Sequence, residues 1–354
     1  MPAPYRIAAW NKVAEKLGND FMVVFCCRRE PNRQWNVPEI KFPHIYLKEN
    51  FRIKNNGTTF VHKNPDVWKH LNAFRPDVII TGGFNPTMLY AFFYSLLKRK
   101  KHVPVSDAWK ESEKHLSPAH KLIRKTLYSF SHAFIACSQK GKEYYTSYGL
   151  ADKPVFISHY TINDQSNVGT KAFGDRLYDV MFSGQFAERK NPLFFIEVFK
   201  TLKQKKRDLK VLLIGDGPLR QQMLDELQGA GIDFDYPGYV KQEDLYEYYS
   251  NSKLFLFPTG SDAWGVVANE ALSAGTPVLV TPFAGCSDEL VIHNYNGFVL
   301  PLERDQWASH CAQLLHDEPK WRDFSAKARQ VVAQFTHQRA ADALIEACTY
   351  AFKH

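Results

Sequence analysis

Short apolar runs alternate with amphipathic stretches along almost the whole chain. Most of these runs end in glycine or a polar residue, and a segment with helical spacing of apolar side chains follows. Because parallel strands need a crossover connection, such alternation is typical of a parallel sheet covered by helices. The expected strands are Phe21–Cys26, Val78–Thr81, Val103–Ser106, Ala133–Cys137, Val155–Ile157, Asp179–Ser183, Lys210–Ile214, Phe234–Tyr236, Lys253–Phe257, Val278–Thr281 and Gly297–Val299. The expected helices are Ile7–Leu17, Val67–Phe74, Pro86–Lys98, Pro118–Phe130, Gln139–Tyr148, Pro192–Lys205, Pro218–Leu227, Asp244–Ser250, Val267–Ala274 and Trp307–Asp317.

The pattern divides into two halves around a polar stretch. At 354 residues the chain is too long for one typical core. Thr161–Arg176 lacks periodicity and is predicted to be a linker. We expect an α/β protein of two Rossmann-like, doubly wound domains that face each other across a cleft. These are residues 1–163 and 164–336, and a C-terminal helix at 337–354 is expected to pack back toward the first domain. Residues 1–6 resemble the loop after a first strand, so that strand is expected to be missing or truncated.

One apolar stretch has the length of a membrane span. Val78–Leu97 is predominantly apolar, and a cluster of basic residues follows it. Gly82-Gly83 and Asn85-Pro86 interrupt the stretch, however. These breaks favour a strand, a loop and a helix over a transmembrane helix.

The formal net charge of +8 is unevenly distributed. Residues 1–160 hold 25 basic and 12 acidic side chains, whereas residues 161–354 hold 20 and 25. A basic first half predicts an anionic partner, which could be membrane phospholipid, a lipid diphosphate or nucleic acid. Nucleic acid is the least favoured of these, because no nucleic-acid-binding motif accompanies the charge. The six cysteines show no CxxC pair and no metal-like spacing with histidine, so neither disulfides nor a zinc site is expected. The absence of a disulfide pattern predicts a cytoplasmic location.

Two carboxylates stand in the most informative segment, residues 259–281. Asp262 is placed on a loop and Glu270 in the following helix, both near the carboxyl edge of the predicted sheet. Open α/β sheets bind ligands in the crevice at that edge. Carboxylates there can accept hydrogen bonds from sugar or ribose hydroxyls.

A basic loop follows the predicted strand Asp179–Ser183. Gly184 would let the backbone approach a ligand, and Lys190 stands at a helix start. A lysine and free helix N–H groups can together neutralise a diphosphate. A solvated basic loop is the simpler account of this segment taken alone. Gly215 and Gly217 form a strand-to-helix GxG turn, which is weak by itself.

Together these segments resemble family 4 retaining glycosyltransferases of the GT-B fold. The resemblance covers most of residues 178–301 with the motifs in that family's order, and over residues 1–160 it is weaker. The motifs are Gly184 with Lys190, Gly215-x-Gly217-Pro218, Gly238-Tyr239-Val240, Asp262-x7-Glu270 with Gly275-x-Pro277, and Asn296–Pro301.

The resemblance implies roles for residues of the second domain. Glu270 would hold the nucleotide ribose hydroxyls, while Asp262 and Lys190, the first two catalytic candidates, would contact the donor sugar and the diphosphate. In two places the chain departs from the family. Asp262 stands where a glutamate is usual, and Gln185 where an arginine is usual. The donor-binding candidates are Gly184, Gln185, Arg189, Lys190, Gly215, Gly217, Tyr239, Val240, Asp262, Gly265, Val266, Val267 and Glu270.

The acceptor side is expected in the first domain. Asp107 follows a strand after which the family often has a histidine, and it is the third catalytic candidate. A helix N-cap is an equally good account of Asp107. Gly82 and Gly83 would provide a backbone cradle, and Arg6 a phosphate or acceptor contact from the opening loop.

The implied function is a retaining, metal-independent glycosyltransferase. It would move a sugar from a nucleotide-diphosphate sugar to a glycan or lipid-linked acceptor, in surface polysaccharide or glycoconjugate synthesis. No metal and no cofactor besides the donor is expected. Two alternatives remain open: a nucleotide-sugar epimerase or phosphorylase on the same fold, and a non-catalytic subunit that binds sugar nucleotides.

A peripheral contact with an anionic membrane, at the inner face of the plasma membrane, is a further expectation. Basic residues follow one predicted helix and lie along another, at Lys121, Arg124 and Lys125. A core-facing helix with a solvated basic end explains this pattern equally well. The aromatic residues placed at the membrane interface are Tyr90, Phe92, Phe93 and Tyr94.

Overall fold

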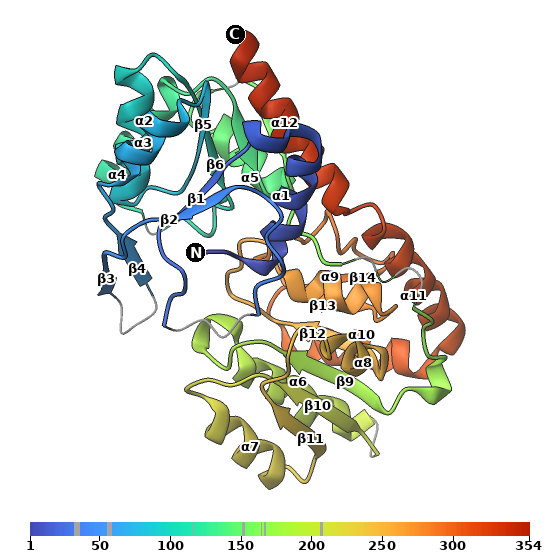
Figure 1. The fold of residues 1–354 in the computed structure, drawn as a ribbon. Coiled ribbons are helices and arrows are strands. Elements are labelled where there is room, and N and C mark those ends of the chain that lie inside the picture. The colour runs from blue at the N-terminus through green and yellow to red at the C-terminus, as the bar shows by residue number, and fades with distance from the viewer. Residues whose placement is uncertain are drawn as a thin grey trace. The chain divides into compact units, whose positions relative to one another are not determined.

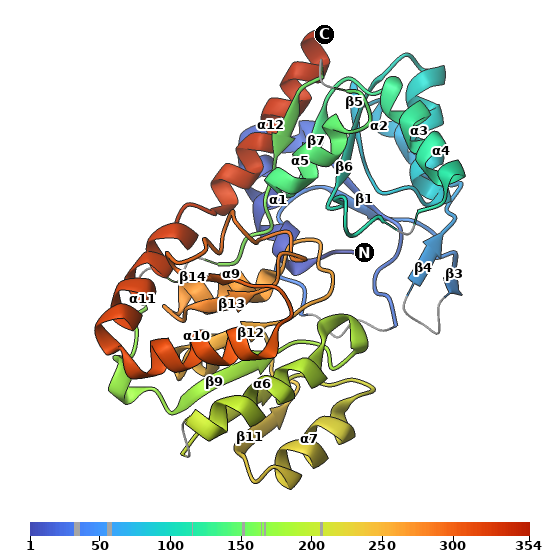
Figure 2. The same ribbon diagram turned by 180° about the vertical axis from the view of Figure 1, so that it is seen from behind.

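The structure is a computed structural model in which the chain forms two compact units (Figures 1 and 2). It describes residues 1–31, 36–54, 59–114, 116–150, 153–163, 165, 168–205 and 208–354. The first unit contains Met1–Thr161 and Thr336–His354, and the second contains Ile162–Phe335.

The second unit is built on a six-stranded parallel sheet with the order β11-β10-β9-β12-β13-β14. The chain thus starts in the middle, moves to one edge and returns to build the other half. In such sheets the ligand crevice lies where the strand order reverses, here between β9 and β12. The strands are β9 (Tyr178–Ser183), β10 (Lys210–Ile214), β11 (Asp233–Gly238), β12 (Ser252–Phe257), β13 (Val278–Val280) and β14 (Gly297–Val299). The helices are α6 (Pro192–Lys205), α7 (Arg220–Gly229), α8 (Leu245–Ser250), α9 (Val266–Ser273), α10 (Arg304–His316) and α11 (Glu318–Val332), with 3₁₀ turns at Phe173–Asp175 and Glu188–Lys190.

The core of the second unit surrounds its central strand. All six residues of β9 are buried, which is typical of a strand covered by helices on both faces. Phe182 of β9 packs against Phe195 of α6, and Phe195 against Phe199. β9 pairs directly with β12. The loops that follow these two strands therefore lie beside each other.

The first unit contains a four-stranded parallel sheet in the order β5-β6-β7-β8. Two smaller pairings accompany it: parallel β1-β2 and antiparallel β3-β4. The strands are β1 (Val23–Phe25), β2 (His44–Tyr46), β3 (Phe51–Lys54), β4 (Thr59–His62), β5 (Val78–Gly82), β6 (Lys101–Ser106), β7 (Phe134–Ala136) and β8 (Val155–Ile157). The helices are α1 (Pro4–Leu17), α2 (Val67–Phe74), α3 (Pro86–Leu97), α4 (Pro118–Ser129), α5 (Gln139–Thr146) and α12 (His337–Lys353), with a 3₁₀ turn at Gly18–Asp20.

The C-terminal helix is part of this first unit. Ala341, Leu344 and Ala347 of α12 pack in one buried cluster with Val13 of α1 and Val103 of β6. The C-terminal and N-terminal helices therefore cover the same sheet, as both ribbon views show (Figures 1 and 2).

The predicted α/β class is confirmed, and every predicted strand and helix is present with ends shifted by at most three residues. The sequence pattern missed β2, β3, β4 and α11. The three strands have three or four residues each, and each includes a polar or charged residue, so none forms the continuous apolar run by which other short strands were recognised.

Two expectations about chain segments were wrong. Residues 4–6 do not lie in a loop, because α1 begins at Pro4, where a proline suits the first helical turn. The predicted linker also ends too late. Arg176 is buried in the second unit, where its guanidinium donates to Ser252 O at 2.7 Å and to Thr276 Oγ1 at 2.7 Å.

The apolar stretch Val78–Leu97 forms a strand, a loop and a helix, as predicted. β5 ends at Gly82, and α3 begins after Asn85, whose side chain accepts a hydrogen bond from Met88 N at 3.3 Å. In the described part of the chain, no helix combines the length and the apolar character needed to cross a membrane.

Candidate active site

The loops after β9 and β10 interlock at the carboxyl edge of the second sheet. Gly184 N donates to Ile214 O at 3.0 Å, and Phe186 N donates to Asp216 O at 2.9 Å. A Cβ on Gly215 would lie 1.9 Å from Gly184 O, and one on Gly217 would lie 2.4 Å from Phe186 O. Both glycines of the GxG turn are therefore required by the contact between these two loops, whatever else their backbone touches.

The loops after β9 and β12 are joined by backbone contacts. Gly260 N donates to Arg189 O at 2.8 Å, and Asn191, in a left-handed conformation with φ 48°, donates from its amide to Pro258 O at 2.8 Å. Thr259 Oγ1 donates to Arg189 O at 3.2 Å. These bonds hold the turn that carries Lys190 at the point where the strand order reverses, between β9 and β12.

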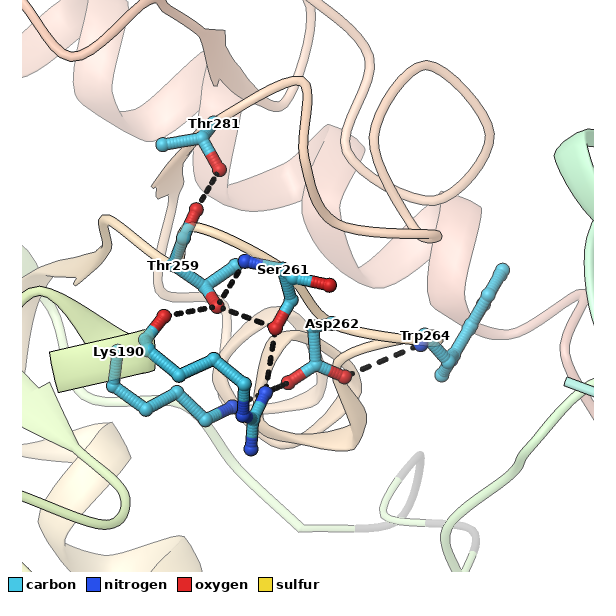
Figure 3. Close-up of polar contacts among 7 residues, drawn as sticks. Lys190, Thr259, Ser261, Asp262, Trp264 and Thr281 are labelled. Carbon is cyan, nitrogen blue, oxygen red and sulfur yellow. Dashed lines mark hydrogen bonds and ion pairs between the residues drawn. The ribbon is translucent and has the colours of Figure 1, made fainter. Parts of the chain in front are cut away.

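Lys190 and Asp262 form an ion pair at this point (Figure 3). Their side chains are only 13% and 17% exposed, and the Lys190 ammonium also lies 4.8 Å from the centre of the Phe257 ring. Burial lowers the pKa of Lys190, and Asp262 offsets this only in part. For Asp262, burial acts to raise the pKa, but the Lys190 charge outweighs it and the pKa lies below its ordinary value. The ion pair thus favours the charged form of Asp262.

Asp262 is held by the backbone that leads into α9. Trp264 N donates to Asp262 Oδ1 at 3.2 Å (Figure 3). Gly265 has φ +103°, and a Cβ there would lie 2.5 Å from the Phe257 ring. The N-cap residue of α9 is Gly265, and no side chain caps this helix. The backbone N–H groups of Val266 and Val267 therefore receive no capping hydrogen bond from the N-cap residue.

Glu270 lies on α9 and pairs with a tyrosine. Tyr249 Oη donates to Glu270 Oε2 at 3.1 Å. Burial raises the pKa of Glu270 to about 7, and the hydrogen bond from Tyr249 opposes part of that rise. Glu270 is therefore a carboxyl group that titrates near neutral pH at the edge of the sheet.

Tyr239 and Val240 follow β11 on the other side of the sheet edge. Gly238 has φ +77° and accepts a hydrogen bond from Gly215 N at 2.9 Å. Tyr239 is 53% exposed. Both residues line an open hollow of about 780 Å³, together with Gln165, Pro237, Lys241, Glu243, Asp244, Tyr246, Glu247 and Tyr248.

Of the remaining donor-binding candidates, Arg189 lies beside the Lys190–Asp262 pair. Arg189 Nη1 donates to Ser261 O at 2.5 Å and lies 3.5 Å from Asp262 Oδ2. Gln185 is exposed on the loop after β9. The structure therefore puts Arg189 in contact with the candidate sugar-binding carboxylate.

In the first unit, Tyr160 contacts both of the acceptor-side candidates Arg6 and Asp107. Tyr160 Oη donates to Asp107 Oδ2 at 3.0 Å, and the Arg6 guanidinium lies 4.1 Å from the centre of the Tyr160 ring. Arg6 is only 8% exposed and donates to Ser158 O at 3.1 Å and to Cys137 Sγ at 2.7 Å. The cluster lies where β6, β7 and β8 end, which is the carboxyl edge of the first sheet.

Two predictions for this side need correction. Arg6 does not reach out from an opening loop, because it lies on α1 and its guanidinium is held by buried acceptors. Asp107 caps no helix, since the next helix, α4, is capped by Ser117. Gly82 and Gly83 end the neighbouring strand, and Gly83 has φ +88° with open space around it.

Sequence reasoning missed Tyr249 and Tyr160, which bind the carboxylates Glu270 and Asp107. Neither tyrosine lies in a motif of the resemblance. Tyr249 is 21 residues from Glu270 and Tyr160 is 53 residues from Asp107, so only the folded chain brings each pair together.

Comparison with known proteins identifies the second unit. Residues 167–331 match the family of glycosyl transferases group 1. A 2-deoxystreptamine N-acetyl-D-glucosaminyltransferase from Niallia circulans is 30% identical over 125 residues, which make up 35% of this chain and 32% of that relative. In several curated relatives the chain spans only about a third of the relative's length.

Two further likenesses extend over more of the chain. The GalNAc-alpha-(1->4)-GalNAc-alpha-(1->3)-diNAcBac-PP-undecaprenol alpha-1,4-N-acetyl-D-galactosaminyltransferase from Campylobacter jejuni is 22% identical over 270 residues, 75% of this chain and 73% of that protein. The crystal structure of Anabaena HepE in complex with UDP-glucose matches with a TM-score of 0.72 and 17% identity over 99% of this chain and 96% of HepE. HepE shares the fold of this chain, which is that of GT-B glycosyltransferases. Residues 167–331, the segment that matches the glycosyl transferases group 1 family, hold Lys190, Asp262 and Glu270.

Proposed function

We propose that the protein is a retaining, metal-independent glycosyltransferase that moves a sugar from a nucleotide-diphosphate sugar to a glycan or lipid-linked acceptor. The observation that carries this proposal is the Lys190–Asp262 pair, which lies at the strand-order reversal of a group 1 family domain. A cation and a carboxylate side by side at that point suit the two halves of the donor, its diphosphate and its sugar.

Lys190 is assigned to the leaving diphosphate. Negative charge grows on the diphosphate as the bond to the sugar breaks, and a fixed ammonium beside it stabilises that charge. The uncapped start of α9 adds N–H groups of the same polarity. These groups supply the positive charge that divalent cations provide in many phosphoryl-transfer sites.

Asp262 is assigned to the donor sugar. Binding of a diphosphate would draw the Lys190 ammonium toward the phosphate oxygens. The Asp262 carboxylate, held by Trp264 N, could then accept a hydrogen bond from a sugar hydroxyl. Its side chain is one methylene shorter than the glutamate usual in the resembling family.

Glu270 and the hollow beside Tyr239 are assigned to the nucleoside. The Glu270 carboxylate can accept hydrogen bonds from both ribose hydroxyls, and the exposed Tyr239 ring offers a face on which a base could stack. HepE is described with UDP-glucose, which makes UDP-sugars the first donors to test.

The acceptor is assigned to the carboxyl edge of the first sheet. Asp107, bound by Tyr160, could accept a hydrogen bond from the attacking hydroxyl, and Gly83 leaves the adjacent backbone open. The Campylobacter relative is named for an undecaprenol-linked acceptor. We therefore place this protein in surface polysaccharide or glycoconjugate synthesis with a lipid-linked acceptor.

Peripheral docking to an anionic membrane forms part of the proposal. On α4, Leu122 and Ile123 are 66% and 51% exposed, and the exposed Lys121 and Lys125 flank them. Exposed apolar side chains between lysines suit a surface of anionic lipid. Vesicle sedimentation should show salt-sensitive binding to anionic but not zwitterionic lipid, and Leu122→Ser with Ile123→Ser should abolish it.

The exposure of the side chains on α3 decides which of its aromatic residues can contact a membrane. Phe92 and Tyr94 are 4% and 2% exposed, so their predicted place at the membrane interface was wrong. Phe93 and Leu97 are 50% and 70% exposed near the end of the same helix. These two are the candidates on α3.

The deciding experiment is a donor screen followed by a transfer assay. Thermal shift against UDP-, GDP-, ADP- and dTDP-sugars should single out one donor, because a ligand that binds only the folded state stabilises it by mass action. Transfer to a lipid-linked acceptor should then give a product with the donor's anomeric configuration, read by NMR. An inverted product would overturn the retaining mechanism. Transfer that needs Mg²⁺ or Mn²⁺ would overturn metal independence at this site.

A non-catalytic binding subunit is the second candidate, and the exposed neutral Gln185 favours it. Such a subunit would give the thermal shift with one donor but neither transfer nor donor hydrolysis. An epimerase or phosphorylase would instead consume the donor without an acceptor, or with inorganic phosphate.

A further inference from the structure

Cys27, Glu30 and His62 gather in the first unit. One ligand atom of each residue, a thiol sulfur, a carboxylate oxygen and a ring nitrogen, lies within 4.8 Å of the other two. Cys27 and Glu30 follow β1, and His62 ends β4. The linear spacing did not indicate this set, because His62 lies 32 residues beyond Glu30 and reaches it through the β3–β4 pair.

We propose that these three residues form a zinc site that fastens the β3–β4 pair to the segment after β1. Thiolate, imidazole and carboxylate are the ligand types that zinc takes in proteins, at bond lengths of about 2.0–2.3 Å. Such bonds place neighbouring donor atoms about 3–4 Å apart. His62 Nε2 and Glu30 Oε1, at 3.0 Å, already have this spacing, and small side-chain rotations would bring in the sulfur. Water would take the fourth position.

Burial supports a cation at this place. Cys27 is fully buried and the His62 side chain is 6% exposed, while that of Glu30 is 16% exposed. Burial raises the pKa of the Cys27 thiol, so a bound cation would be needed to hold it as the thiolate that binds zinc. A divalent ion with one thiolate, one carboxylate and one neutral imidazole gives a site with no net charge.

The site is independent of the proposed transfer reaction. It would bind its ion whether or not the donor assignments hold, and metal independence at the Lys190–Asp262 pair does not exclude a structural ion in the first unit. Its role would be to stabilise the β3–β4 pair, since a bound metal adds its binding free energy to folding.

Cobalt titration of the chelator-treated full chain tests the proposal. We expect one equivalent of Co²⁺ to bind with a thiolate-to-cobalt charge-transfer band, and Zn²⁺ to displace it. Cys27→Ser should lose the band, whereas the adjacent buried cysteine gives the matched control Cys26→Ser, which should keep it. His62→Gln and Glu30→Gln should each weaken Co²⁺ binding at least tenfold.

A second measurement covers loss of folding in a variant. Zn²⁺ should raise the Tm of the unmodified chain and of Cys26→Ser, but not that of Cys27→Ser or His62→Gln. If Cys27→Ser does not fold by circular dichroism, the two ligand variants His62→Gln and Glu30→Gln carry the test. Cobalt bound without the thiolate band, or a band that survives in Cys27→Ser or His62→Gln, would overturn the site.

Discussion

Tyr249 donates a hydrogen bond to Glu270 at 3.1 Å, and this contact restrains a carboxyl group whose pKa burial raises to about 7. The residue proposed to hold the ribose therefore changes charge close to neutral pH. Only its charged form accepts hydrogen bonds with both oxygens.

Nucleotide affinity should consequently rise as pH increases through about 7. Tyr249→Phe removes a hydrogen bond that lowers the Glu270 pKa, so the midpoint of the rise should move to higher pH. Calorimetric titration with UDP across the neutral range would measure both effects. Glu270→Gln is the control. In this variant the pH dependence of affinity should reflect only the ionisation of UDP, without the change that Glu270 adds. A midpoint that is the same in all three proteins would remove Glu270 from the nucleotide site.

Glu270 should also make the apoprotein less stable as pH rises. In the unfolded chain this carboxyl loses its proton near its ordinary value of 4.5, whereas the folded protein keeps it until about 7. The folded state binds the additional proton between these values, so this contribution to the free energy of unfolding falls as pH increases from 4.5 to 7. A shift of this size corresponds to roughly 3 kcal/mol. Urea unfolding at several pH values should show a shallower decline for Glu270→Gln, and an unchanged slope would contradict the assignment.

The sequence was sufficient for the strands of the second unit and for all of its helices except α11. Its central strands β9, β10 and β12 have five or six residues each, and nearly all of them are buried. β9 is entirely buried, and α6 starts at Pro192 directly after a left-handed asparagine. β2, β3 and β4 lack such signals. Their positions depend on pairing with distant segments, which no local pattern encodes.

The candidate site could be located from the sequence, but its internal contacts could not. Motif order placed Lys190 and Asp262 on adjacent strand ends, whereas their ion pair needs the bonds that Arg189 O accepts from Gly260 N and Thr259 Oγ1. Likewise, Gly215 and Gly217 of the GxG turn were predicted only as donor-binding candidates. The structure shows that Gly217 is needed against Phe186 O in any case.

Gly217→Ala should therefore destabilise the second unit even without ligand. Its new methyl carbon would lie 2.4 Å from Phe186 O and 2.8 Å from Phe186 N, both backbone atoms that cannot rotate away. We expect a loss of about 2–3 kcal/mol in the free energy of unfolding, typical of overpacking. Gly229→Ala is the matched control. It ends α7 with nothing within 4 Å of the new Cβ, and it should be neutral or stabilising by about 0.5–1 kcal/mol. Equal Tm values for the two variants would contradict the steric account.

Gln185→Arg should strengthen donor binding. Gln185 is exposed on the loop after β9, so the longer side chain needs no repacking, and stability should change by less than about 0.5 kcal/mol. A guanidinium there could form a charge-assisted hydrogen bond with the diphosphate, worth about 1.5–3 kcal/mol, or roughly tenfold or more in affinity. Dissociation constants for UDP and for uridine would test this, because only UDP affinity should increase. An equal effect on both ligands, or none on UDP, would place the diphosphate elsewhere.

Lys190 should affect both stability and transfer, and the two effects can be separated. Lys190→Ala leaves the Asp262 carboxylate buried without its main cation, which should cost about 3 kcal/mol of stability. It should also slow transfer roughly 100-fold, because the leaving diphosphate loses a stabilising charge. Lys190→Ala combined with Asp262→Asn removes the unpaired charge, so the double variant should regain most of the stability while transfer stays low. Arg189→Ala is the control, since that side chain is 52% exposed and its loss should change stability little. Recovery of transfer together with stability in the double variant would show that the pair supports the fold and not the chemistry.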